Sequence, residues 1–61
     1  MGKRAVKVDV IIQASVLDVT REVNEFLERN YPQYELHGHL IYDASGGYWM
    51  QAVVQVETEE N

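Results

Sequence analysis

Three segments of the chain alternate apolar and polar residues with a period of two, and a fourth repeats at helical spacing. The first alternating segment, Val6–Ile12, is rich in β-branched residues, which is typical of a strand. The second is Tyr34–Tyr42 and the third is Tyr48–Thr58. Because successive side chains of a strand point to opposite faces, each segment predicts a β-strand with one apolar face.

The fourth segment predicts a helix that runs from about Val16 to Arg29. Apolar side chains recur there three and four residues apart, as they do along one face of an α-helix. Ser15 followed by Asp18 resembles a capping box with Asp in place of Glu. Pro32 disfavours helical geometry at the residue before it, so the helix is expected to end near Arg29.

The order of elements is therefore β-α-β-β, which predicts a single α+β domain over residues 1–61. Residues 43–47 are expected to form the hairpin loop, with Tyr42 and Tyr48 facing each other across it. The first strand pairs either parallel with the second, through a right-handed crossover, or antiparallel with the third. The latter, a mainly antiparallel three-stranded sheet of order 1-3-2 with the helix on one face, is favoured because it centres the most apolar long strand.

The alternation also assigns the strand residues to two faces of the sheet. The face with Val6, Leu36 and Val54 is predicted to lie under the helix, and the opposite face is predicted to be open. An exposed apolar patch around Trp49 would mark an interface or a ligand groove there. The predicted interface comprises Ile11, His37, His39, Ile41, Trp49, Gln51, Val53 and Gln55.

His37 and His39 are the clearest candidates for chemistry. Two residues apart on a strand, they would project from one face, and neutral imidazoles can share a metal ion. A third ligand would have to be Asp9, Glu35 or Glu57. Because two histidines are a weak metal motif, polar residues of an open or interfacial face are the favoured interpretation, and no metal or other cofactor is predicted. An exposed histidine pair would still make an interface sensitive to pH.

Composition narrows the possible functions. The chain has no cysteine, and Ser15 and Ser45 have capping and turn roles with no histidine nearby, so no enzyme is predicted. The net charge is −5 and no basic stripe is present, which disfavours nucleic acid as a partner. Lys7 and Asp9 interrupt the first apolar segment, and no run is long enough to cross a bilayer. We therefore expect a cytoplasmic protein without membrane contact.

Chain length favours self-association. A domain of 61 residues buries only about 60% of its unfolded surface, so a monomer is marginally stable. Oligomerisation is a common remedy when metals and disulfides are lacking, and a dimer is the simplest expectation. Residues 1–4 and 58–61 are expected to be frayed.

Several motifs resemble a family of very short bacterial and phage domains whose function is unknown. They are Val23-Asn24-Glu25-Phe26-Leu27 after a valine-rich strand, then Gly38, then Gly46-Gly47-Tyr48-Trp49-Met50-Gln51-Ala52-Val53-Val54. The resemblance covers nearly the whole chain. It implies β-α-β-β order, and the phage association suggests an accessory role such as inhibition of a host protein.

A weaker resemblance is to dodecins, small β-α-β-β proteins that form hollow shells and hold flavins between aromatic residues. Gly38-His39-Leu40 and the Gln-rich third strand are similar to theirs. The short helix and the position of Trp49 in the third strand depart from the pattern, which puts flavin binding in doubt.

Three hypotheses follow. The favoured one is a non-enzymatic protein-interaction module, a bacterial or phage accessory protein that self-associates through its sheet. The second is an oligomer that binds a flavin or nucleotide stacked on Trp49. The third is a phage-type inhibitor whose acidic surface occupies the basic groove of a host or bacterial protein.

Overall fold

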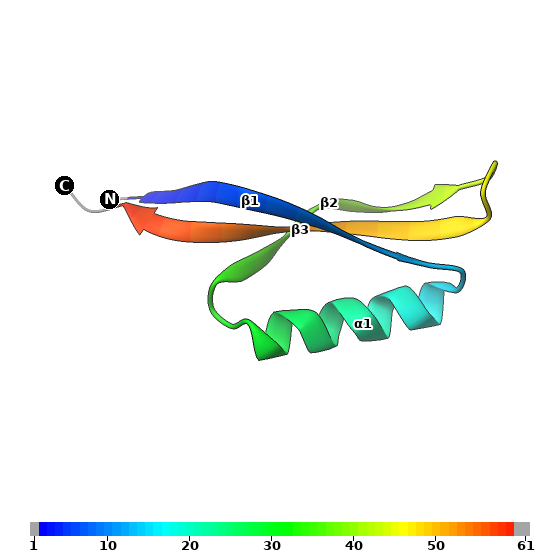
Figure 1. Ribbon diagram of the computed structural model, residues 1–61, viewed down its shortest axis with the longest axis horizontal. Helices are drawn as coiled ribbons and strands as arrows, with labels where there is room; N and C mark the ends of the chain where they lie inside the picture. Colours follow the sequence, from blue (N-terminus) through cyan, green and yellow to red (C-terminus); the bar gives the residue numbers. More distant parts are fainter. Residues whose placement is uncertain (1, 60–61) are drawn as a thin grey trace.

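The computed structural model describes residues 2–59 as a two-layer arrangement, with a sheet above a single helix (Figure 1). The sheet has the order β1-β3-β2, and both outer strands run antiparallel to β3. The predicted α+β class, β-α-β-β order and 1-3-2 sheet are thus confirmed. The elements are β1 (Gly2–Gln13), α1 (Val16–Arg29), β2 (Tyr34–Asp43) and β3 (Tyr48–Glu59).

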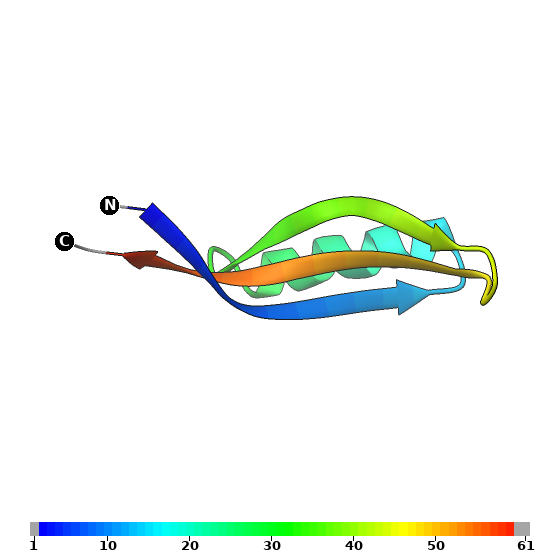
Figure 2. The ribbon, with the colours of Figure 1, turned by 90° about the horizontal axis from the view of Figure 1, so that it is seen from above.

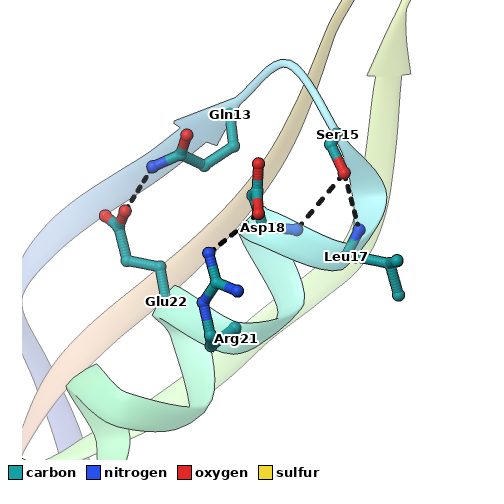
Figure 3. A network of polar contacts seen from close by, with 6 residues as sticks. All are labelled: Gln13, Ser15, Leu17, Asp18, Arg21 and Glu22. Carbon is teal, nitrogen blue, oxygen red and sulfur yellow. Dashed lines mark hydrogen bonds and ion pairs between the residues drawn. The ribbon is translucent and has the colours of Figure 1, made fainter.

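Helix α1 begins and ends where the sequence predicts. The Ser15 Oγ accepts hydrogen bonds from the backbone N–H groups of Leu17 (3.2 Å) and Asp18 (3.4 Å), which satisfies two donors that the first turn leaves free (Figure 3). Asp18 pairs with Arg21 at 2.8 Å. At the other end, the backbone N–H and the side-chain amide of Asn30 both donate to the Phe26 carbonyl.

The core lies between α1 and one face of β1 and β3. Ile11, Val19, Val23 and Val53 are buried there and contact one another, and Phe26, Leu27, Tyr34 and Trp49 pack around them. At the edge of α1, the Gln13 side-chain amide donates to the Glu22 carboxylate, which ties the end of β1 to the second turn of the helix (Figure 3). The helix is therefore fixed over the face of β1 that carries Ile11.

The loop between β2 and β3 is one residue shorter than predicted. Asp43 belongs to β2 and lies opposite Tyr48, which leaves residues 44–47 as the loop. The Gly47 N–H donates to the Asp43 carbonyl at 2.7 Å, and Gly47 has a φ of 73°, where glycine is favoured. Tyr42 consequently lies opposite Trp49, so the predicted pairing of Tyr42 with Tyr48 is wrong.

This one-residue difference reverses the predicted faces of β1 and β3. Because side chains alternate along a strand, a shift of one residue moves every side chain of β3 to the other face. Val53 lies opposite Leu36 and is buried under α1, and Ile11 of β1 lies opposite Gln51. The prediction that Val54 shares the helix side with Leu36 is therefore wrong, whereas Leu36 itself lies on the helix side of β2 as predicted.

The chain ends form more structure than predicted. Residues 2–4 of β1 pair with residues 57–59 of β3, and the Arg4 guanidinium lies 3.3 Å from the Glu57 carboxylate. Seen from above, these strand ends extend together beyond α1 (Figure 2). The prediction of frayed ends is wrong for residues 2–4 and 58–59. For residues 1, 60 and 61 it lies outside the described part of the chain.

Candidate interaction surface

The face of the sheet that points away from α1 has no second layer over it within residues 2–59 (Figures 1 and 2). Its residues follow from the register, because directly opposed residues of antiparallel strands project to the same face. They form three rows that each cross β1, β3 and β2 in that order. The rows are Ile12, Met50 and Ile41; Val10, Ala52 and His37; and Val8, Val54 and Glu35. We call these nine residues the open face.

The apolar side chains of the open face contact solvent on the two outer strands, whereas Val54 on the central strand is only 6% exposed. Val8, Val10 and Ile12 on β1 are 57%, 54% and 50% exposed, and Ile41 on β2 is 55% exposed. On the covered face of the same sheet, Ile11 is 7% exposed and Val53 is fully buried. Exposed apolar patches on soluble proteins are typical of interaction sites and ligand grooves, which makes this face the candidate surface.

An ion pair bounds one end of this patch. The Lys3 ammonium on β1 lies 2.6 Å from the Glu35 carboxylate on β2, so the pair bridges across β3. The hydrogen bond from Lys3 to Glu35, together with the negative charge of Glu35, raises the pKa of Lys3. Since both side chains are in contact with solvent, the pair adds little stability, and its main effect is to neutralise Glu35, the one acidic group among these nine residues.

His37 is the last paired residue before a bulge in β2, and His39 lies within that bulge. Between His37 and Ile41, β2 contains two more residues than β3 contains between the partners of these two residues. Within this extra stretch, Gly38 has a φ of 74°. The buried Gln51 amide donates to the carbonyls of His37 and Gly38, both at 3.2 Å, and thereby holds the bulge against β3. The regular alternation that would place His37 and His39 on one face is broken. Within residues 2–59, no group of three acidic, histidine or cysteine side chains could hold a metal ion.

The predicted interface residues are divided between the two faces. Ile11, Gln51 and Val53 are buried beneath α1, so their assignment to an open face is wrong. Trp49 also packs against the core, and its ring lies 4.9 Å from that of Tyr42. Gln55 is half-buried on this side, opposite Tyr34. Only His37 and Ile41 belong to the open face, and His39 lies in the bulge.

Ile41 lies on the open face as the alternation predicts, whereas the apolar residues of β1 in the patch lie on the opposite face from the predicted one. Val8, Val10 and Ile12 were expected in the core because they alternate cleanly with polar residues. The hairpin loop determines which face of β3 is covered. The Asp43 carboxylate accepts hydrogen bonds from Ser45, and Asp43 pairs with Tyr48, which sets the register of β3. These hydrogen bonds from the Ser45 hydroxyl and N–H lower the pKa of Asp43.

A small cavity of about 130 Å³ lies on the covered side, between α1 and β2. Its walls are mainly apolar, and Leu36 beside it is 56% exposed. Thr20, Asn24 and Gln51 supply the polar groups. The cavity is smaller than the roughly 300–1,000 Å³ of typical ligand pockets, so it offers little room for a flavin or nucleotide.

Comparison with known protein families, with curated proteins and with solved structures finds no match for this chain. The resemblance to short bacterial and phage domains and to dodecins therefore stays a prediction from the residues quoted above. None of the helical structure in residues 2–59 is both long and apolar enough to cross a membrane.

Proposed function

We propose that this chain is a non-enzymatic interaction module that self-associates face to face through the open face, most simply as a symmetric dimer. The observation that carries this proposal is the exposure of Val8, Val10, Ile12 and Ile41 in one continuous apolar patch. A layer placed over them would remove apolar surface from water, which is the main driving force of protein association. The cytoplasmic location and the bacterial or phage accessory role expected from the sequence complete the proposal.

The size of the sheet suits such an interface. A standard protein interface buries about 800 Å² on each partner, which is about one sixth of the 4633 Å² accessible surface of this chain. In the view of Figure 2 the molecule extends 45 Å by 13 Å, so its projection is roughly 600 Å² before the relief of the side chains is added. The whole sheet side therefore reaches the lower end of the range of stable interfaces, about 600 Å² on each partner.

Charge favours a second copy as the occupant. The chain carries a net charge of −5, so two copies repel each other over most of their surfaces. The open face is less acidic, because Glu35 is the only acidic residue among its nine and pairs with Lys3, and Asp43 at the hairpin end is a second acidic residue that the register places on this side. A nearly neutral apolar patch is complementary to itself, as a two-fold symmetric contact requires.

The proposal is tested by the mass in solution, measured by light scattering coupled to size exclusion over a concentration series. The wild type is expected near 14 kDa, twice the 7.0 kDa of the chain. Val10→Glu places a charge in the middle row and is expected to run as a monomer, since an unpaired charge is costly to bury.

Leu17→Glu is the matched control, because Leu17 is 76% exposed but lies on the first turn of α1, away from the open face. An acidic residue is compatible with a helix N-terminus, so this variant is expected to keep the wild-type mass. Circular dichroism establishes that both variants are folded. A wild type that is monomeric at every concentration, or a dimeric Val10→Glu variant, would overturn the proposal.

A further inference from the structure

His37 is the only residue of the open face that can gain a charge near neutral pH. It lies in the middle row, directly opposite Ala52 of β3, with Val10 of β1 on the far side of Ala52. Histidine is the side chain whose charge ordinarily changes between pH 5 and 8. The middle of the proposed contact therefore contains a group whose charge depends on pH.

We infer that protonation of His37 separates the dimer, so that the module associates at neutral pH and dissociates under mildly acidic conditions. This inference rests on the proposed function, because it concerns the same face. An imidazolium buried in the contact would lose hydration without gaining a partner, which is unfavourable.

Two carboxylates share this face of β2 with His37, and each already has a hydrogen-bond partner. Glu35, in the neighbouring row of β2, is held by Lys3 of β1 at 2.6 Å. Asp43, at the far end of β2, already accepts hydrogen bonds from Ser45. Asp9 and Lys7 of β1 lie opposite Val53 and Gln55 and so project to the covered face. The charged residues of α1 lie beyond the sheet (Figure 1), and His39 is in the bulge.

The two simplest two-fold arrangements of the dimer both predict that protonation of His37 weakens it. If the two-fold axis runs along the strands, β2 stacks on β1 of the second copy, and His37 lies against the valine and isoleucine side chains there. If the axis crosses the strands at the middle row, β2 stacks on β2 and the two copies of His37 approach each other. Desolvation opposes the cation in the first case, and like-charge repulsion opposes it in the second.

The direction in which pH changes dimerisation follows from proton linkage. A histidine that is neutral in the dimer has a lower pKa there than in the free monomer. The monomers then bind more protons than the dimer does as the pH falls, so acidification favours dissociation. We expect the dissociation constant to be at least tenfold larger at pH 5.5 than at pH 7.5.

Analytical ultracentrifugation of the full chain at pH 7.5 and 5.5, at constant ionic strength, tests this inference. His37→Gln is expected to dimerise with the same dissociation constant at both pH values. His39→Gln is the matched control and is expected to keep the wild-type pH dependence. If His37→Gln weakens the dimer at pH 7.5, His37→Leu offers a second uncharged side chain with the same expected loss of pH dependence.

The outcomes separate the inference from the proposed function. A wild type that is monomeric at pH 7.5 would refute the dimer itself. A wild-type dimer with equal dissociation constants at the two pH values would refute only the role of His37, as would a pH dependence that persists in both His37 variants. Circular dichroism at pH 5.5 distinguishes dissociation of folded monomers from acid unfolding.

Discussion

The helix covers the opposite face of β1 and β3 from the one that their residues predict. It lies over the more polar face of β1, and the more apolar face is exposed. On the covered face, β1 presents polar residues around a single apolar one, Ile11, and β3 contributes the buried Gln51. On the open face, β1 presents Val8, Val10 and Ile12, all at least half exposed. The comparison teaches that an apolar strand face need not be covered by the chain's own helix. Here the more apolar face of β1 lies away from α1.

The fold could be predicted because each element has its own local signal. Alternation defines the strands, and Ser15 at one end and Pro32 beyond the other set the bounds of α1. The assignment of faces could not be predicted, since it depends on whether Asp43 belongs to the loop or to the strand. Val53 and Val54 are adjacent, so β3 offers an apolar residue to whichever face the register selects.

The largest effect on the free energy of unfolding is expected when a valine is replaced by alanine, and the change is made once on each face for comparison. Val53→Ala removes two methyl groups from a fully buried site and is expected to lower the free energy of unfolding by about 2–3 kcal/mol at any protein concentration. Val10→Ala is expected to leave the unfolding of the monomer nearly unchanged and to weaken dimerisation instead. Urea unfolding at low and high protein concentration measures both, and equal losses in the two variants at low concentration would contradict the assignment of faces.

The next largest effect on stability is expected at Gln51, the buried polar residue of the covered face. Gln51→Met keeps the side chain's length but removes the amide that holds the carbonyls of His37 and Gly38. We expect a loss of about 1–2 kcal/mol in the free energy of unfolding, and faster amide exchange around the bulge. Gln55→Met, on the same strand and face, serves as the control. Equal stability of the two variants would show that the bulge does not depend on Gln51.

A smaller effect is expected at the start of α1. Ser15→Ala removes the acceptor for the Leu17 and Asp18 N–H groups and is expected to cost about 1 kcal/mol in thermal or urea unfolding. Ser15→Asp supplies another capping oxygen and is expected to restore most of that loss. Since the cap lies on the helix layer, dimerisation should be unaffected, and a changed mass of the Ser15→Ala variant would contradict the separation of the two faces.

The smallest effect is expected from the ion pair at the edge of the open face. Because the pKa of Lys3 is raised by Glu35, its contribution to stability is present below about pH 10.4 and is lost as the pH rises through the raised value. Lys3→Met is expected to remove this alkaline dependence with little change at pH 7.5. Unfolding curves of both proteins measured between pH 8 and 11 test this expectation, and an alkaline loss of stability that persists in Lys3→Met would contradict it.

The most direct test is an isotope-filtered NMR experiment on a mixture of labelled and unlabelled chains, which separates contacts between copies from contacts within one copy. The account predicts intermolecular contacts from the methyl groups of Val8, Val10, Ile12 and Ile41. It predicts only intramolecular contacts from Val53 to α1. Intermolecular contacts from Ile11 and Val53, with Val10 and Val54 in contact with the helix, would contradict both the assignment of faces and the proposed dimer.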